Sequence, residues 1–476
     1  MTSDPRRWRS LPIILAATFM ALFDVFVVNV SAPSIQRDLH ASSGGLELVL
    51  AAYSFTYAIG LVTGGRLGDL FGRRRLFAIG MAIFTAASLL CGLAPTIGML
   101  IGGRLLQGAG AAAMTPQVLA LITVGFPAEE RTRAFAFFGA TVGLGTVAGQ
   151  ILGGALLQLN IAGLGWRPIF FINVPVGIAA VIGAVRLVRE SRAPAGERID
   201  PLGLVTLTAG LAALVVPLVL GRNAGWPLWT WVSLAGSVAL LSVFAWWERV
   251  LERRGGSPLL RPELLRVPAM VNGIAITAAY YCFFGGFLLV FTLFLQNGLH
   301  DTPLQAGLTL APLGVAFASS SLAGRRLAAR FGAISMVTLG TVLSGLGLLV
   351  LAVSVNTAGV GVATLPLRAS LVLTGIGNGL VIPLLLGAVM TAVPSRMTGA
   401  ASGVLTSTAQ LSISLGVALI GLLFFQRVPS SGIGAATAES LFCDLGLVVV
   451  ASAMSFTLSR LRREPLLEGP ALQEAA

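Results

Sequence analysis

The chain has 476 residues, of which 56% are apolar and only 11% are charged. Soluble domains carry about a quarter of charged residues, so this composition indicates a membrane protein and argues against a soluble enzyme or binding module. The formal net charge of +12 would suit a nucleic-acid-binding protein only if the basic residues formed one face, but they lie in short clusters between apolar runs.

Apolar runs of about 20 residues, the length that crosses a bilayer as an α-helix, recur along the whole chain. The sequence therefore predicts an all-α polytopic membrane protein with fourteen transmembrane helices. The expected spans are 11–31, 46–65, 76–94, 97–121, 133–157, 168–188, 201–221, 227–247, 268–296, 304–324, 333–354, 368–392, 399–425 and 438–459. The first run is too long for a signal peptide and lacks a small-residue cleavage site, so we expect it to be retained.

The basic residues favour one side of the membrane. Of the 31, 25 fall in loops on the side of the N-terminus and five on the opposite side. By the positive-inside rule, this bias predicts that both termini are cytoplasmic. No loop exceeds about twenty-five residues, which makes a membrane-bound enzyme or receptor with a soluble domain a remote alternative.

An internal repeat divides the chain. Five glycines and prolines recur at a constant offset of 267 residues: Gly108, Gly110, Pro116, Pro127 and Gly149 return as Gly375, Gly377, Pro383, Pro394 and Gly416. A fainter echo links residues 67–72 to residues 327–332. Both echoes shift the chain by eight spans, which predicts two equivalent six-helix halves. The expected domains are an N-terminal bundle (1–190), a two-helix insertion (191–255), a C-terminal bundle (256–462) and a cytoplasmic tail (463–476). Two such halves suit a transporter that rocks about a site at the membrane midplane.

Asp24 is an acid inside the first apolar run. It lies thirteen residues into that span, about 20 Å from the cytoplasmic surface at 1.5 Å per residue. Arg104 and Tyr53 each lie seven residues into spans that descend from the other side, about 10 Å deep. In a hydrocarbon core of roughly 30 Å these levels coincide.

An acid, a base and a phenol at one depth form a candidate proton-handling cluster, with Gln107 nearby. A carboxylate alone in a medium of low dielectric constant stays protonated, whereas one beside an arginine can ionise. The alternative is a static pair between Asp24 and Arg104 that anchors two helices.

The loop between the second and third spans is a candidate conformational latch. Its expected residues are Gly65, Asp69, Gly72, Arg73 and Arg74. Asp69 can pair with the neighbouring arginines, or with the N-terminus of a helix in the other half. Breaking that latch would favour the inward-open state.

The fifth span carries glycines four residues apart. They are Gly145, Gly149, Gly153 and the adjacent Gly154. This spacing lines one helix face and lets another helix approach closely. Packing is the simplest interpretation, and a role as a bending or sealing helix is the alternative.

Four segments together resemble the major facilitator superfamily, and specifically its drug:proton antiporter family with fourteen spans. They are LFDVFVVNVSAP (22–33), GRLGDLFGRRR (65–75), RLLQGAG (104–110) and WRPIFFINVPVG (166–177). The resemblance implies a major facilitator fold arranged 6+2+6, with Arg104 as the proton-linked arginine. This chain departs from the family where Gly149-Gln150 replaces the usual Gly-Pro of the fifth span, and where Ala329 stands in the second-half loop at the position of Asp69.

The resemblance implies a proton-driven efflux transporter of the bacterial plasma membrane that exports antibiotics or toxic metabolites. We expect a monomer without a cofactor, with Asp24 as the proton carrier. A dedicated exporter of one secondary metabolite and a proton-coupled uptake carrier are the alternatives. The expected substrate cavity is lined by Phe23, Asn29, Tyr280, Tyr281, Phe284, Asn378 and Gln410.

The charged residues narrow the expected substrates. Asp444 is the only further acid expected inside a span of the second half. A pump for dications would ordinarily need two buried carboxylates, so we expect amphipathic substrates that are neutral or monovalent cations. The three cysteines and two histidines show no spacing typical of metal ligands, and we expect no metal.

Overall fold

The structure is a computed structural model that describes residues 7–192, 200–221, 224–256, 258–259, 262–390, 393 and 398–461. Within these residues the regular secondary structure is helical throughout. The α-helices are α1 (Arg7–Asp38), α2 (Ser43–Phe71), α3 (Arg73–Gly92), α4 (Ile97–Gly125), α5 (Ala128–Leu159), α6 (Pro168–Phe171), α7 (Asn173–Leu187), α8 (Pro201–Leu220), α9 (Leu228–Arg253), α10 (Pro268–Leu293), α11 (Pro303–Phe331), α12 (Ala333–Ala358), α13 (Thr364–Met390) and α14 (Thr398–Leu461). Short helices lie at η1 (Ile161–Gly163), η2 (Pro262–Arg266), η3 (Phe294–Gly298, a π-helix) and η4 (Gly359–Gly361).

Twelve helical segments in the described residues are long and apolar enough to cross a bilayer. They include the continuous segment Pro168–Leu187, which joins α6 and α7 as the sixth expected span. Helix α5, with 32 residues, covers the fifth expected span. The all-α polytopic membrane fold is confirmed, and the count of fourteen spans stays a prediction.

Helix α14 is 64 residues long, but it doubles back. Its backbone leaves helical geometry at Gly432, with φ 79° and ψ 167°. Near this turn Ile433 lies against Gly298, after the end of α10, whereas Thr457 donates a 2.8 Å hydrogen bond to Asn272 at the start of α10. The second arm of α14 therefore runs antiparallel to α10. The first arm, on the other side of the turn at Gly432, also packs on α10 through Ile413 and Ile420, so the two arms lie beside α10 as the last two expected spans would.

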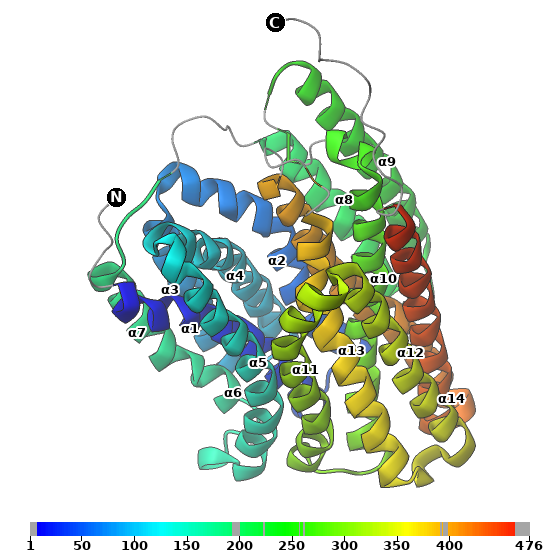
Figure 1. Cartoon of the computed structure of the whole chain (residues 1–476). Coiled ribbons are helices and arrows are strands. Elements are labelled where there is room, and N and C mark those ends of the chain that lie inside the picture. The colour runs from blue at the N-terminus through cyan, green and yellow to red at the C-terminus, as the bar shows by residue number, and fades with distance from the viewer. Residues whose placement is uncertain are drawn as a thin grey trace, which may run out of the picture.

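Two groups of helices pack in the same pattern. In the first, α1 packs on α5, α2 on α4, and α3 on α4 and α7; in the second, α10 packs on α14, α11 on α13, and α12 on α13 and α14. Figure 1 shows the first group in blue to cyan on one side and the second in green to red on the other. The groups meet where α5 lies beside α11 and α2 lies beside α14.

The repeated glycines occupy equivalent contacts in the two groups. The α-carbon of Gly108 on α4 lies against the Tyr53 carbonyl of α2, where a Cβ would clash. Gly375 on α13 lies in the same way against the Leu313 carbonyl of α11. A side chain at either position would push the helices apart, so the sequence repeat records a repeated close approach of helices.

The insertion helices α8 and α9 pack on each other outside the junction of the two groups. Val215 of α8 is buried against Ala418 of α14, in a small cluster that also includes Leu48 of α2. Helix α9 leaves Trp231 and Trp246 exposed. The insertion thus covers the seam between α2 and α14 on one side and presents apolar surface on the other.

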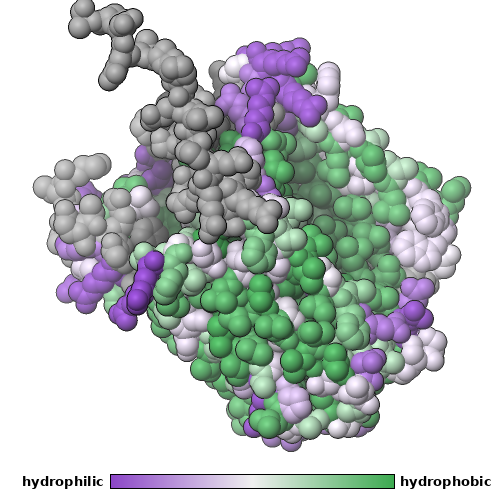
Figure 2. All heavy atoms as spheres, turned by 45° about the vertical axis from the view of Figure 1, so that its right-hand side comes forward, coloured by the Kyte–Doolittle hydropathy of each residue, from purple (hydrophilic) through white to green (hydrophobic). Residues whose placement is uncertain are grey.

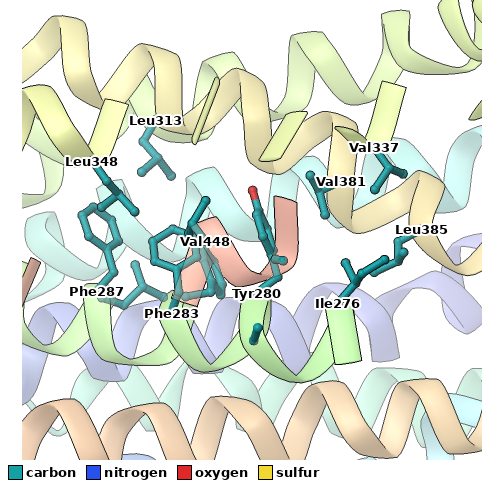
Figure 3. Packing of buried hydrophobic residues seen from close by; sticks show 14 of the residues in the cluster. Ile276, Tyr280, Phe283, Phe287, Leu313, Val337, Leu348, Val381, Leu385 and Val448 are labelled. Carbon is teal, nitrogen blue, oxygen red and sulfur yellow. The ribbon is translucent and has the colours of Figure 1, made fainter. Parts of the chain in front are cut away.

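The exterior and the interior are both apolar, as expected for a protein in lipid. Figure 2 shows a broad hydrophobic face with hydrophilic residues at its margins. Inside the second group, aromatic and aliphatic side chains from α10 to α14 form one cluster around Phe283 and Phe287 (Figure 3). Monomeric soluble proteins rarely expose such large apolar patches, so this surface is fitted to a bilayer.

We call the end of the molecule at the α2–α3 turn, with Arg73 and Arg74, the basic face, and the opposite end the distal face. Two hydrogen bonds join the groups in the distal half. Gln296 Nε2 donates to the Val30 carbonyl (2.6 Å), and Ser414 Oγ donates to the Ala51 carbonyl (3.0 Å). The two groups are therefore sealed together toward the distal face.

Candidate functional site

Asp24 lies at the centre of a polar cluster inside the first group of helices. Its side chain is completely buried. Arg104 Nη1 of α4 forms an ion pair with Oδ2, and Gln107 Nε2, one turn further along α4, donates to Oδ1 at 2.9 Å. Asn173 Nδ2 of α7 lies 3.5 Å from Oδ1. The carboxylate is thus surrounded by donors, which is the condition that allows a charge to be buried.

Arg104 is held from three sides as well. Its Nε donates to the Val49 carbonyl of α2 at 3.1 Å, and its Nη1 also donates to Gln107 Oε1 at 2.9 Å. The guanidinium carbon lies 4.6 Å from the centre of the Tyr53 ring. The structure therefore brings together all four residues of the predicted cluster. Removing one partner of such a buried pair typically costs about 3–5 kcal/mol, because the other charge is left uncompensated.

Two members of this cluster are absent from the sequence prediction. Ser88 Oγ of α3 accepts from Gln107 Nε2 (2.7 Å) and from Asn173 Nδ2 (3.3 Å). The two members are Ser88 and Asn173, and both are buried. The signal that the sequence gives for them is a polar residue inside an apolar span. Apolar spans also hold many serines that bond only to their own helix, such as Ser31, so the signal alone does not select Ser88.

A narrow cavity lies next to the cluster, between the two groups of helices. Its lining includes Asn29, Tyr53 and Arg104 from the first group and Phe284 and Ile413 from the second. Its volume of about 20 Å³ holds a water molecule but no drug-sized ligand. Asp24 lies behind Arg104 and Tyr53 and does not line the cavity, so Arg104 separates the acid from the space between the groups.

The expected substrate residues divide between this cavity and other places. Asn29 and Phe284 line it. Tyr280 and Asn378 do not, since the Tyr280 hydroxyl donates to Asn378 Oδ1 at 2.6 Å inside the second group. Phe23 is buried in a hydrophobic core cluster. Tyr281 and Gln410 are half-buried and lie outside the lining of this cavity.

The candidate latch is built within the first group. Asp69 Oδ1 accepts from Arg73 Nε (3.0 Å) and Nη2 (2.7 Å), one turn along the chain. Gly72 between them has φ 110°, a conformation that favours glycine, and it joins α2 to α3. Of the two partners weighed for Asp69, the structure shows the neighbouring arginine rather than a helix of the other half.

Glu190, after α7, is the partner that sequence reasoning missed at this turn. Its Oε1 accepts from the Arg74 backbone N–H at 3.0 Å, and its Oε2 lies 3.6 Å from Arg74 Nε. Gly65 lies one helix turn before Asp69, where a side chain would meet Pro116 of α4 at an ordinary contact distance of 3.8 Å. The turn therefore links α2, α3 and the end of α7 into one unit.

The N-terminal end of α1 is fixed at the basic face. Arg7 Nε and Nη2 each lie 2.7 Å from a different oxygen of Glu130 on α5, and Trp8 Nε1 donates to the same carboxylate at 3.0 Å. The Arg7 guanidinium holds the pKa of the Glu130 carboxyl, ahead of the expected span 133–157, below its usual range. This stabilisation is present at neutral pH and is lost as the pH falls through that lowered pKa. It fixes the helix that carries Asp24.

The glycines of α5 face α1, as their spacing predicts. A Cβ at Gly145 would meet Leu22 at 3.1 Å, one at Gly149 would meet Phe26 at 2.7 Å, and one at Gly153 would meet Val27 at 2.7 Å. Gly154 faces the other way, and its Cβ would meet the Pro303 carbonyl of α11 at 2.6 Å. Close packing of α5 between α1 and α11 accounts for all four.

We expect Gly149→Ala to destabilise the protein by about 1–3 kcal/mol, because the added methyl group forces α1 and α5 apart beside Asp24. Thermal unfolding in detergent checks this. Gly139→Ala on the same helix is the matched control, since a Cβ there meets nothing within 4 Å. Equal melting temperatures for the two variants would contradict the close approach.

Gln150 is buried next to Gly149, and neither atom of its amide has a hydrogen-bond partner among the described residues. An unsatisfied buried amide costs about 1–3 kcal/mol. Gln150→Leu is therefore expected to raise the melting temperature. Gln107→Leu, a change of the same size at a buried glutamine that bonds Asp24 and Ser88, is expected to lower it. A melting temperature that falls in both variants would show that Gln150 has a partner in the folded protein.

In the second group, the positions equivalent to the two members of the ion pair are apolar. Gly149 of α5 lies against the carbonyl of Phe23 on α1, and its repeat partner Gly416 lies against the carbonyl of Cys282 on α10. Phe23 and Cys282 are therefore equivalent, which relates α1 to α10 by an offset of 259 residues. By this offset, Phe283 occupies the position of Asp24. By the glycine repeat, Leu371 stands where Arg104 stands. Both are buried. The ion pair thus belongs to one half alone.

Buried acids are more numerous than the sequence suggests. Glu47 of α2, near the distal face, is 1% exposed and lies against Gly421 of α14, where the two groups meet. Asp200 and Glu248 are buried at the basic end of the insertion helices, where Asp200 accepts from Trp247 Nε1 at 3.0 Å. Asp444 is also fully buried. Glu47, Asp200 and Glu248 lie near helix ends in the sequence, where an acid is normally expected to be exposed. Asp444 lies inside the second arm of α14.

Comparison with known proteins identifies the family and the relatives of this chain. Residues 14–417 match the family model of the Major Facilitator Superfamily. The chain is 39% identical over 426 residues to the probable actinorhodin transporter of Streptomyces coelicolor, covering 89% of this chain and 74% of that protein. It is 34% identical over 405 residues to the multidrug resistance protein Stp of Mycobacterium tuberculosis (85% and 73%), and 32% identical over 427 residues to the tetracenomycin C resistance and export protein of Streptomyces glaucescens (89% and 77%).

Solved structures agree on the fold. An auto-inhibited peptide transporter of the POT family superposes with a TM-score of 0.68 at 17% identity, covering 97% of this chain and 99% of that one. An inward-facing bacterial homologue of the lysosomal transporter Spinster superposes with a TM-score of 0.64 at 18% identity, covering 96% and 98%. The fold and the family model lead to the same result, and the relatives are named as a transporter, a multidrug resistance protein, and a resistance and export protein. The chain belongs to the Major Facilitator Superfamily.

Proposed function

We propose that this protein is a proton-driven efflux transporter that exchanges external protons for amphipathic compounds from the cytoplasm. The observation that carries the proposal is the buried pair of Asp24 and Arg104, with Arg104 lining the cavity between the two groups of helices. The relatives named for resistance to and export of tetracenomycin C, and for resistance to puromycin, support the efflux direction.

The geometry suggests how a proton and a cation compete. While Asp24 is ionised, it neutralises Arg104, and the cavity tolerates a positive substrate. When Asp24 takes a proton, the guanidinium charge is uncompensated and faces the cavity directly. Two unit charges about 7 Å apart repel by roughly 2 kcal/mol at an effective dielectric constant of about 20. Protonation therefore expels the cation, which is the coupling that an antiporter needs.

The membrane arrangement belongs to the same proposal. We place the basic face in the cytoplasm of a bacterial cell, with both termini on that side and fourteen spans arranged 6+2+6 over the domains 1–190, 191–255 and 256–462. The cavity is too narrow for a substrate in this conformation. Substrate entry thus requires the two groups to separate at the basic face, where the turn of Asp69, Arg73 and Glu190 would rearrange. The transporter works as a monomer without a cofactor, driven by the proton gradient.

A susceptibility panel in a bacterium that lacks its own pumps tests the function. The native chain is expected to protect against ethidium, puromycin and tetracenomycin C, and a protonophore is expected to remove this protection. Asp24→Asn is expected to lose the protection against ethidium, a permanent monovalent cation. Equal protection by both chains, unaffected by the protonophore, would eliminate proton coupling through Asp24.

The second candidate is a dedicated exporter of one secondary metabolite. The 39% identity to the probable actinorhodin transporter favours it. The same panel separates the two functions, because a dedicated exporter protects against one compound and leaves the susceptibility to the others unchanged.

A further inference from the structure

Asp444 is a buried acid that the mechanism above does not use. It lies in the second arm of α14 and is 0% exposed. Neither of its carboxyl oxygens has a hydrogen-bond partner among the described residues. Asp24, in contrast, is surrounded by the donors of Arg104, Gln107 and Asn173.

The internal repeat places Asp444 at an equivalent of the proton cluster. Gly80 of α3 and Gly340 of α12 make equivalent contacts. A Cβ on Gly80 would lie 2.8 Å from the carbonyl of Gly110, and a Cβ on Gly340 would lie 2.8 Å from the carbonyl of Gly377, the repeat partner of Gly110. Helices α3 and α12 are therefore related by an offset of 260 residues. In the first half, Thr85 of α3 lies against Gly177 of α7. Its counterpart Gly345 lies against Val448 of α14, at 3.5 Å.

The second arm of α14 therefore follows α7 at an offset of 271. By this offset, Asp444 occupies the position of Asn173. Asn173 is the α7 residue that donates toward Asp24. The second half thus carries an acid, Asp444, on its last helix. Its position is equivalent to that of Asn173, which lies at the level of Asp24 in the first half.

Among the residues that the structure describes, none gives Asp444 a compensating charge. The positions equivalent to Asp24 and Ser88 are Phe283 and Leu348, which are both fully buried and lie with Val448 in one apolar cluster (Figure 3). Cys282 of α10 and the adjacent Cys443 are the ionisable groups within electrostatic reach of Asp444 that the described residues provide.

In the described part of the chain, the other helices packed on this arm add no cation near Asp444. Helix α12 has no ionisable side chain, and Arg368 on α13 is exposed. Burying an unpaired carboxylate costs far more than burying the neutral acid. Asp444 therefore carries its proton in this conformation, and it can release that proton only when the helices rearrange to admit water.

We propose that Asp444 is a second proton-carrying site, so that each cycle moves one proton on Asp24 and one on Asp444. An O–H bond forms at Asp444 with a proton from external water and breaks when the proton passes to cytoplasmic water. This inference rests on the proposed antiport function and adds its stoichiometry. Two protons exchanged for one monovalent cation carry one net positive charge inward, so the exchange responds to the membrane potential.

Proteoliposomes with a potassium gradient and valinomycin test this charge. One charge moved across 100 mV is worth about 2.3 kcal/mol, which is about fifty-fold in the steady-state gradient of ethidium. The native chain is expected to show this response, corrected for liposomes without protein. Asp444→Asn is expected to respond to a pH gradient alone. Glu439→Gln is the matched control on the same arm, because Glu439 is only half-buried and pairs with Arg427 (2.8 Å), and it should keep the native response.

A second measurement guards against misfolding. Addition of ethidium to the purified protein in weakly buffered detergent should release one proton fewer from Asp444→Asn than from the native chain, and ethidium binding itself shows that the variant is folded. A native response to potential, or native proton release, in Asp444→Asn would overturn the second site. If neither a pH gradient nor a potential drives ethidium through the native chain, the proposed antiport function fails instead.

Discussion

Replacement of Asp24 by asparagine is expected to abolish the export of lipophilic monovalent cations and to weaken the export of neutral compounds. Asparagine has one acceptor oxygen in place of the two that accept from Arg104 and Gln107, and it has no charge, so the guanidinium that lines the cavity is never neutralised. By the Coulomb estimate above, the affinity for a monovalent cation falls roughly thirty-fold. A neutral substrate still enters, but its accumulation falls about ten-fold for each unit of pH gradient, because one proton is no longer exchanged.

Proteoliposomes with an imposed pH gradient measure both effects, with ethidium as the cation and an uncharged antibiotic as the neutral substrate. Asp38→Asn is the matched control, because Asp38 lies at the distal end of the same helix and pairs with Arg167 outside the cluster (2.8 Å). It should transport both compounds as the native chain does. Ethidium accumulation by Asp24→Asn at the native level would contradict the proposed competition between proton and cation.

The second large effect is expected at Arg104. Arg104→Leu leaves the Asp24 carboxyl buried without its charge partner and breaks the bond to the Val49 carbonyl. We expect a loss of about 3–5 kcal/mol in the free energy of unfolding. Arg104→Lys is expected to recover part of it, since an ammonium group restores the charge but cannot contact Asp24, Gln107 and Val49 together.

A double-mutant cycle isolates the pair. In the double variant Asp24→Asn, Arg104→Leu, no charge is left uncompensated, so it should be more stable than Arg104→Leu alone, although it should not transport. Unfolding of all four chains in the same detergent gives the coupling between the two side chains. Additive losses would show that the two residues do not stabilise each other, and the buried ion pair could not then be the coupling device.

The sequence predicted the depth of the site because depth depends on few quantities. A helix rises about 1.5 Å per residue and the hydrocarbon core is roughly 30 Å thick, so positions within spans place Asp24, Arg104 and Tyr53 at one level. The structure brings these side chains together. The internal repeat was also readable, because close helix approaches require glycine and so leave the same residue type at the same offset.

The direction in which each side chain points was not readable from the sequence. Rotation of a helix about its axis is set by packing against its neighbours, which single apolar spans do not encode. Their positions in the sequence place Tyr280 and Asn378 among the expected substrate residues, whereas in the structure the two side chains bond to each other inside the second half. For the same reason Glu190 was missed, since its contact with Arg74 joins residues 116 positions apart.

Composition and periodicity thus determined by themselves that this chain crosses a membrane many times, in two related halves, with an acid and a base at one depth. These properties follow from hydropathy and helix rise, which are local. The tertiary structure alone decided that Asp24 faces into its own bundle behind Arg104, with Ser88 and Asn173 as further neighbours, and that Asp444 is buried without a hydrogen-bond partner in the described part of the chain. Those facts depend on how four or more helices turn toward one another, and only their mutual packing fixes that.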